Sequence, residues 1–299
     1  MTMEHDYLIR AMAAKEQIRA FAVETTGITE YARKIHDNSP IATAALGRLM
    51  SAGLMMGQML KSDEDKLTLQ LLGDGPMKHV IVTSNLLGTV RGYVSNPEVM
   101  LPPKADGHFD IGGAIGRGGS LTVIRDMGLK EPYVSSIPLH SGEIADDLTY
   151  YFAQSEQVPT SVGLGVLMNH DNTVRAAGGF IVQLMPFTKK EVIEHLEENL
   201  RKVSGVTDIL RQGKTIEEML AIVLDGFDLQ ITDKKPVSWH CNCSFERGKE
   251  VLATLKDEEL LSMIQEGKDI HVGCDFCGKS YVYTPQDIKE IIENKKKSK

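Results

Sequence analysis

The sequence predicts an α+β protein: an N-terminal domain of mainly antiparallel β-sheet with packed helices, a helical linker and a small C-terminal domain. Three observations support this prediction. Short strand-like segments follow one another with few helices between them, and a charged segment with helix-start signals follows Pro186. All four cysteines lie between residues 241 and 299. Because the composition changes after Pro186 and again at Pro236, we expect domains at 1–186, 187–235 and 236–299.

The predicted strands are rich in β-branched and apolar residues and are bounded by turn residues. They are 66–72, 78–83, 88–94, 120–125, 133–139, 162–168 and 173–184. Asn169-His-Asp-Asn172 is a natural hairpin turn before the last of these strands. Because few helical crossovers separate consecutive strands, the sheet is predicted to be mainly antiparallel.

Two helices are predicted within this sheet domain, at 39–60 and at 143–155. The first has Ser39 as a plausible N-cap and Pro40 in the first helical position. Met50, Leu54, Met55 and Met59 recur at three- and four-residue steps. A buried core helix explains them better than a ligand site, because methionine commonly fills gaps in cores.

The chain is expected to be cytoplasmic, with no membrane contact. Residues 1–20 mix acids and bases at helical spacing and contain no apolar core of a signal peptide. The uncharged apolar stretch 49–60 has twelve residues, whereas a membrane span needs about 20. The net charge of −8 argues against a general nucleic-acid binder, which needs a basic surface.

The segment 187–235 is predicted to be helical and weakly apolar. Of its 49 residues, 18 are charged. Thr188 with Glu191, and Thr215 with Glu218, have the spacing of capping boxes, and Gly205 and Gly226 are predicted helix ends. From composition alone, a solvated helical connector is the simplest interpretation.

No catalytic motif is found, so the chain is not predicted to be an enzyme. The glycine-rich stretch 112–119 lacks the pattern of a nucleotide-binding loop and is followed by a predicted strand rather than a helix. Tight turns between strands are the expected use of these glycines. The patterns of serine hydrolases and of helical zinc proteases are also absent.

The strongest functional signal is Cys241-Asn-Cys243 together with Cys274-Asp-Phe-Cys277. Four thiolates suit tetrahedral zinc, and clustered cysteines without a spread-out disulfide pattern indicate a reducing compartment. Cys277-Gly278 resembles a zinc knuckle, in which peptide N–H groups point at sulfur. His240 and His271 are interpreted as neighbours, because four cysteines already complete a closed site.

A small core is expected around this metal. Its candidate members are Trp239, Phe245, Leu252, Leu255, Leu260, Leu261, Ile264, Phe276, Tyr281 and Tyr283. A unit of about 60 residues is marginal by itself, so removing the metal should largely unfold it. The terminal run Lys295, Lys296, Lys297 and Lys299 is expected to be a frayed, solvated end.

Two roles remain open for the four cysteines on these grounds. A closed site of four thiolates is usually structural. The short spacing within each cysteine pair, however, gives an oxidised thiolate an immediate resolving partner, which would eject the metal.

The chain resembles the redox-regulated chaperones of the 33-kDa heat-shock protein type. The resemblance spans the whole chain and includes the four-cysteine pattern and several further motifs. These motifs are Ser244 with Glu246, the YFAQSEQVPT segment at 151–160, AAGG at 176–179, QLMP at 183–186 and RGYVSNP at 91–97.

The resemblance implies an ATP-independent holdase that is inactive when reduced and zinc-bound. Oxidation would form disulfides Cys241–Cys243 and Cys274–Cys277, release zinc, unfold the C-terminal domain and free the linker from the N-terminal domain. The active protein, commonly a homodimer, would then bind unfolding clients and pass them to ATP-driven foldases. A client-binding and dimerisation role for 1–186 and a switching role for 187–235 follow from the same resemblance.

Two other functions remain as alternatives. A zinc ribbon that binds nucleic acid is disfavoured by the acidic composition. A thiol–disulfide oxidoreductase that uses Cys274 and Cys277 is disfavoured because no βαβ pattern surrounds them.

Overall fold

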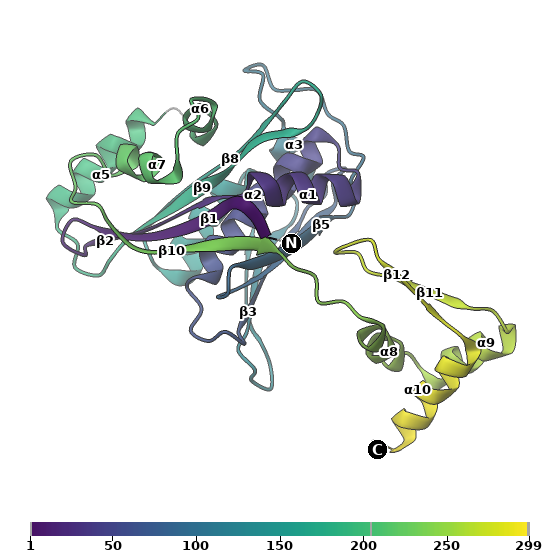
Figure 1. Ribbon diagram of the computed structural model, residues 1–299. Helices are drawn as coiled ribbons and strands as arrows, with labels where there is room; N and C mark the ends of the chain where they lie inside the picture. The colour runs from purple at the N-terminus through teal and green to yellow at the C-terminus, as the bar shows by residue number, and fades with distance from the viewer. Residues whose placement is uncertain (1, 204, 298–299) are drawn as a thin grey trace. The chain divides into compact units, whose positions relative to one another are not determined.

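The computed structural model describes residues 2–203 and 205–297 and divides them into two compact units (Figure 1). The N-terminal unit ends at His240 and the C-terminal unit begins at Cys241. Within the described residues, no helix is both long and apolar enough to cross a membrane.

The N-terminal unit is built on one sheet of ten strands. They are β1 (Thr2–Ala13), β2 (Ile18–Glu24), β3 (Lys66–Leu72), β4 (His79–Asn85), β5 (Thr89–Val94), β6 (Ser120–Asp126), β7 (Tyr133–Pro138), β8 (Thr160–Met168), β9 (Val174–Leu184) and β10 (Gln230–Trp239). Their order is β7-β6-β3-β4-β5-β10-β1-β2-β9-β8. Each neighbouring pair is antiparallel except β10 and β5, so the predicted α+β class with a mainly antiparallel sheet is confirmed.

The helices of this unit fall into two groups. Those before the linker are α1 (Thr26–His36), α2 (Pro40–Gly57), α3 (Ile111–Ile115), α4 (Ile144–Tyr151) and the π-helical turn η1 (Phe152–Glu156). Those of the linker are α5 (Lys190–Lys202), α6 (Val206–Arg211) and α7 (Ile216–Val223).

Helix α2 confirms the predicted buried core helix. The Ser39 hydroxyl accepts the N–H of Ala42, and Pro40 begins the helix. Almost every side chain of α2 is buried, because the helix packs against β3, β4, β5, β8 and β9. This packing makes α2 the centre of the main core.

The two faces of the sheet carry different layers. Leu8 and Phe21 belong to the main core with α2, whereas Ile9 and Ala20 belong to a second core. Because neighbouring residues of a strand point to opposite faces, the second core lies on the other face of β1, β2 and β9. Linker helices α5, α6 and α7 cover it.

The N-terminus and the end of the linker differ from the sequence expectations. Residues 1–20, with charges at helical spacing, contain strand β1 and the start of β2. Gln230–Trp239 form strand β10, which lies between β1 and β5 and crosses the predicted boundary at residue 235. Tertiary pairing determines both strands: Ile231 lies opposite Ala11.

Of the two predicted capping boxes, one is confirmed and one is wrong. Thr215 and Glu218 cap α7 reciprocally. Thr188 instead donates its hydroxyl to the carbonyls of Gln17 and Met185, and Lys189 is the N-cap of α5. The β1–β2 turn therefore holds the start of the linker.

The glycine predictions are also only partly correct. Gly226, with φ 79°, lies in the turn after α7. Gly205 is the N-cap of α6, whereas α5 ends at Lys202 with Val203 as its C-cap. Gly112 and Gly113 lie in helix α3 rather than in a turn, because the Asp110 side chain caps that helix.

The C-terminal unit contains three helices and a two-stranded antiparallel sheet. Its elements are α8 (Phe245–Ala253), α9 (Asp257–Glu266), β11 (Ile270–Gly273), β12 (Ser280–Tyr283) and α10 (Pro285–Lys297). The buried core consists of Leu252, Leu260, Tyr283, Ile288, Ile291 and Ile292.

Three expectations about this unit are wrong. Trp239 is buried in the main core beside Tyr31, because it lies on β10. Leu261 is exposed. Lys295 pairs with Asp257 at 2.8 Å rather than fraying, because α10 packs on α9; Lys299 lies outside the described residues, as do the side chains of Lys296 and Lys297.

Candidate metal centre

The first cysteine pair lies in the loop before α8. Ser244 ends this loop, because its hydroxyl accepts the N–H of Arg247 and caps the helix. Cys241 and Cys243 are partly buried. A single residue separates them, so the loop carries both sulfurs to one place.

The second pair lies in the turn between β11 and β12. The N–H of Cys274 donates to the carbonyl of Lys279 at 2.9 Å, and the N–H of Gly278 donates to the carbonyl of Cys274 at 2.8 Å. Gly278 has a φ of 70°, which glycine adopts without strain. The N–H groups of Phe276 and Cys277 point at the Cys274 sulfur, and that of Lys279 points at Cys277. This turn has the features of a zinc knuckle.

All four sulfurs converge, as the spacing predicted. They lie within 4.8 Å of one another, and they form the cysteine cluster. The Sγ atoms of Cys241 and Cys274 are 3.7 Å apart, and those of Cys243 and Cys277 are 3.3 Å apart. Both of these short distances join one pair to the other.

The cysteine cluster fits a tetrahedral zinc ion. Zn–S bonds of about 2.3 Å place tetrahedral sulfurs about 3.8 Å apart, close to the 3.7 Å between Cys241 and Cys274. Zinc is therefore compatible with both the donor set and the spacing.

The thiols of the cluster differ in acidity. Burial raises the pKa of Cys274, and burial together with the neighbouring sulfurs raises that of Cys277 to about 12. Burial also opposes ionisation of Cys243, but hydrogen bonds from Tyr281 and from the other cysteines outweigh it and lower its pKa to about 7. Without a cation, four adjacent thiols do not all ionise, whereas a bound dication stabilises the thiolates.

Tyr281 contacts the cysteine cluster, although the sequence analysis placed it only in the core. Its hydroxyl donates to the Cys243 sulfur at 3.3 Å, and this hydrogen bond raises the pKa of Tyr281 to about 12. Its position four residues after Cys277, on β12, was the only available signal.

The two neighbouring histidines do not join the cysteine cluster. Among the described residues, the cluster of possible ligand atoms contains only the four cysteines. The N–H of His240 donates to the carbonyl of Val90 in the N-terminal unit, and His271 is exposed on β11.

The chain is similar to known proteins over nearly its whole length and not only at the cysteine cluster. A family model described as "Hsp33 protein" matches residues 6–284. The 33 kDa chaperonin of Agathobacter rectalis is 50% identical over 286 residues, which cover 96% of this chain and 99% of that protein. The 33 kDa chaperonin of Clostridium perfringens is 46% identical over 294 residues, which cover 98% of this chain and 92% of that protein.

A solved structure gives the same result. The crystal structure of the 33 kDa chaperonin (heat shock protein 33 homolog) from Thermotoga maritima matches with a TM-score of 0.87 and 35% sequence identity. The match covers 98% of this chain and 100% of that chain. The chain therefore belongs to the Hsp33 family of chaperones.

Proposed function

We propose that the chain is a redox-regulated, ATP-independent holdase of the reducing cytoplasm rather than an enzyme. Its reduced form holds one zinc ion on Cys241, Cys243, Cys274 and Cys277 and does not bind clients. The observation that carries this proposal is the convergence of all four cysteines on one point. In the chain, the cysteine cluster begins directly after the linker helices α5, α6 and α7 and strand β10. The three helices cover an apolar face of the sheet.

Oxidation of the cysteine cluster is the proposed signal. Formation of each disulfide transfers two electrons from a pair of zinc-bound thiolates to one hydrogen peroxide, which takes up two protons from solvent and is reduced to two waters. We assign the disulfides to Cys241–Cys243 and Cys274–Cys277 on the family resemblance. Because Cys241 lies 3.7 Å from Cys274 and Cys243 lies 3.3 Å from Cys277, the other combinations are also within reach, and disulfide mapping is the decisive measurement of the pairing.

Oxidised cysteines no longer supply the four thiolates that bind zinc, and the C-terminal unit then loses its main support. Its sheet has only two strands, which are marginal without further packing. The apparent binding free energy of structural zinc in zinc-finger peptides is about 10–16 kcal/mol, and it stabilises the folded state. Reversing a two-state equilibrium from 1:99 to 99:1 needs about 5.5 kcal/mol, so the signal is large enough.

The linker covers the surface that we propose to be exposed. Its buried apolar residues pack on the outer face of β1, β2 and β9. On the linker they are Leu196, Val206, Ile209, Leu210, Ile216, Met219, Leu220, Val223 and Leu224; on the sheet they include Ile9, Ala11, Ala20, Ala22, Phe180 and Val182. Release of these helices would expose both apolar surfaces to unfolding clients.

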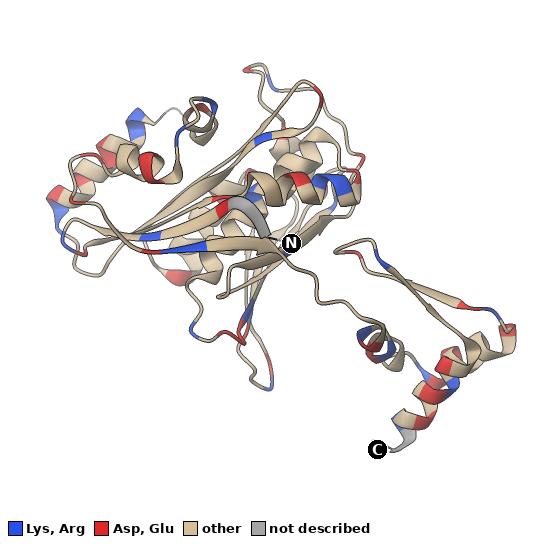
Figure 2. Cartoon of the chain, viewed as in Figure 1, with Lys and Arg blue, Asp and Glu red and all other residues tan. Residues whose placement is uncertain are grey.

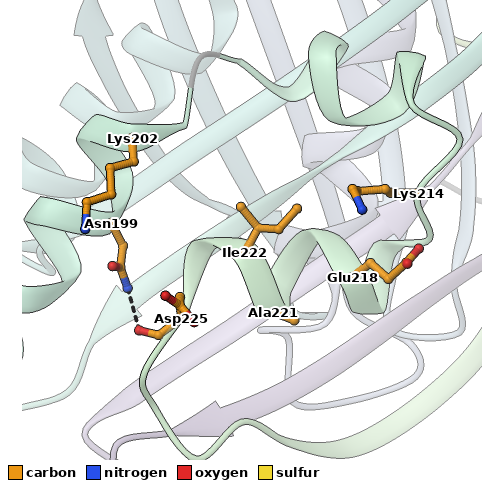
Figure 3. A pocket seen from close by; sticks show the side chains of 7 residues that line it. All are labelled: Asn199, Lys202, Lys214, Glu218, Ala221, Ile222 and Asp225. Atoms are coloured by element: carbon orange, nitrogen blue, oxygen red, sulfur yellow. Dashed lines mark hydrogen bonds between the residues drawn. The ribbon is translucent and has the colours of Figure 1, made fainter.

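Polar contacts between the linker helices are sparse. Asn199 on α5 donates its side-chain amide to the carbonyl of Asp225 after α7, at 2.7 Å (Figure 3). Beside this bond lies an open hollow of about 440 Å³, into which the exposed Ile222 projects. Many charged side chains of the linker are exposed, and the red and blue segments of the ribbon mark where these residues occur along α5 and α7 (Figure 2). Such a segment stays folded mainly through docking.

The client class is any protein that exposes apolar segments as it unfolds. We further propose that the active form is a homodimer and that clients pass to ATP-dependent foldases, both on the family resemblance. Nucleic acid and membranes are not among the proposed partners.

One sample treated with peroxide under mild heat tests the proposal. We expect zinc release measured with a chromogenic chelator, disulfides mapped by mass spectrometry, and gained suppression of light scattering from a thermally unfolding client. All three changes should reverse with a thiol reductant.

The test variant is Cys241→Ser/Cys274→Ser, and Ser262→Ala on an exposed position of α9 is the control. The control should switch as the wild type does. If the double variant still gained client binding only after peroxide, sensing by the cysteine cluster would be wrong.

A further inference from the structure

A cavity of about 400 Å³ lies in the N-terminal unit beyond the end of α2. Its apolar lining includes Met59, Leu60, Phe152 and Val158, with Met127 among the exposed residues that border it. This volume is at the small end of the range for ligand pockets. Such pockets are lined mostly by apolar side chains, and a few polar groups orient the ligand. Size and wall therefore suit a small ligand with an apolar body.

Arg19 supplies a positive charge in this cavity, and an amide rather than a carboxylate binds it. Its Nε and Nη2 atoms donate to one oxygen of Gln183, at 3.2 and 2.7 Å. Gln183 is buried and in turn donates to Thr160. Within the described part of the chain, no carboxylate pairs with Arg19, and burial followed by the charge of Arg10 lowers its pKa. A partly buried guanidinium without an anion is costly.

The second arginine of the cavity is already paired. Arg125 donates to Glu156 at 2.7 Å, and the Tyr151 hydroxyl donates to the same oxygen at 2.6 Å. Glu156 ends the π-helical turn η1, and Gln157 follows with a φ of 55°. π-helical turns occur frequently at functional sites.

The remaining charges leave the cavity with one positive charge in excess. The lining bases are Arg19, Lys61 and Arg125, and the acids are Asp65 and Glu156. Asp65 accepts the backbone N–H groups of Lys61 and Ser62. Glu156 pairs with Arg125, so Arg19 and Lys61 are the lining bases without a carboxylate partner among the described residues. Lys61 is exposed to solvent, whereas Arg19 is partly buried, so the uncompensated charge inside the cavity is that of Arg19.

The proposed chaperone function gives these residues no role, although two of the family motifs build the wall. Phe152, Glu156 and Val158 belong to the 151–160 segment, and Gln183 begins the 183–186 segment. We propose that this cavity binds a small fatty carboxylate, with the carboxylate on Arg19 and the alkyl chain against Met59, Leu60 and Phe152. The inference is independent of the cysteine cluster.

Titration of the ¹⁵N-labelled, reduced full-length protein with octanoate tests this site by NMR. We expect saturable shifts of the Arg19 side-chain Nε–H and of amides around the cavity. Octan-1-ol, which lacks the charge, should bind at least about 10-fold more weakly, as expected for loss of a charge-assisted hydrogen bond. Acetate, which lacks the chain, should bind more weakly as well.

Two matched pairs of variants give the result its specificity. Arg19→Gln should weaken octanoate binding about 10-fold or more, whereas Arg175→Gln on an exposed position of β9 should not change it. Met127→Glu places a like charge at the exposed rim and should also weaken binding, whereas Leu129→Glu, exposed on the same loop, should not.

Three results would overturn the proposal. They are the absence of saturable shifts with octanoate, equal binding of octan-1-ol, and unchanged binding in Met127→Glu with its backbone spectrum intact. Met127→Glu decides the outcome even if Arg19→Gln fails to fold, because Met127 is 42% exposed.

Discussion

At the scale of single residues, Glu30 joins α1 to the sheet. Its carboxylate accepts from Nε and Nη2 of Arg33 at 2.9 Å and from the N–H of Val174 on β9 at 3.0 Å. Lys34 lies 3.4 Å away. The hydrogen bond from Arg33 is the main cause that lowers the pKa of Glu30 to about 2, against a desolvation effect that raises it.

The change Glu30→Gln should therefore destabilise the N-terminal unit at neutral pH. A folded-state pKa below the unfolded value means that the carboxylate stabilises the fold fully above about pH 4.5 and loses this effect as pH falls toward 2. We expect a loss of about 1–2 kcal/mol at pH 7 after allowance for solvent screening. Urea unfolding of the wild type and of Glu30→Gln, at pH 7 and at several pH values below 4.5, measures this loss in the free energy of unfolding.

Glu131→Gln, at an exposed turn position, is the control and should have little effect. The difference between wild type and Glu30→Gln should shrink as pH falls from 4.5. A difference that stays constant down to pH 3 would show that Glu30 acts through packing rather than through charge.

At the scale of elements, a polar cluster fastens helix α7 to the sheet. The Tyr7 hydroxyl on β1 donates to Glu217 at 2.6 Å, and Lys234 on β10 donates to the other oxygen of Glu217 at 2.8 Å. The Lys234 ammonium also lies 4.0 Å from the centroid of the Tyr7 ring. Glu217 thereby connects the linker to two adjacent strands.

The change Tyr7→Phe should loosen the linker without unfolding the sheet. Loss of one hydrogen bond to a charged group costs about 1.5 kcal/mol or slightly more, which corresponds to about 10-fold faster exchange of the α7 amides if they open locally. Hydrogen exchange followed by mass spectrometry resolves α7 from β9. Tyr150→Phe, away from the linker on α4, is the control.

In the variant, peptides from α7 should exchange faster while those from β9 do not change. Equal acceleration of both would mean that the linker and the sheet unfold as one unit, which would contradict a separately released linker.

The elements also show which parts of the fold the sequence predicts and which it does not. Helix α2 was predicted correctly because its cap, its first-position proline and its apolar pattern are all local. Strand β10 was missed because its partners, β1 and β5, are far away in the sequence. Distant pairing is a tertiary effect that overrides local propensity.

The same distinction applies to the candidate site. The cysteine cluster was predicted from local spacing, and its convergence is confirmed. The hydrogen bond from Tyr281 to Cys243 was not predicted, because it depends on the register of β11 and β12. Trp239 was assigned to the wrong core because its strand was missed.

At the scale of the whole molecule, the two units differ in what supports them. The N-terminal unit has ten strands and two apolar cores. The C-terminal unit has a two-stranded sheet, and its core is six buried side chains. A unit of about 60 residues buries only about 60% of its unfolded surface, so the smaller unit has little packing of its own to stabilise it.

Strand β10 is the element that directly precedes the cysteine cluster in the chain. It lies within the sheet between β5 and β1, and Cys241 follows its last residue after only His240. Separation of β10 from its neighbours would leave unpaired edges on β1 and β5, and exposed edges are prone to pair with other chains.

Removal of zinc under reducing conditions should therefore unfold the C-terminal unit and leave the sheet folded. We expect amides of β11, β12 and α8–α10 to lose protection in hydrogen exchange, while those of β3 and β9 keep it. Trp239 is the only tryptophan and is buried in the main core beside Tyr31. Its fluorescence should therefore stay unchanged as far-UV circular dichroism falls.

The same chelator already saturated with zinc is the control and should change neither signal. Protection of β11 and β12 that survived complete zinc removal would show that the six-residue core holds the unit by itself. In that case oxidation of the cysteines would have to act on the linker by another route, because the loss of zinc would no longer be coupled to unfolding.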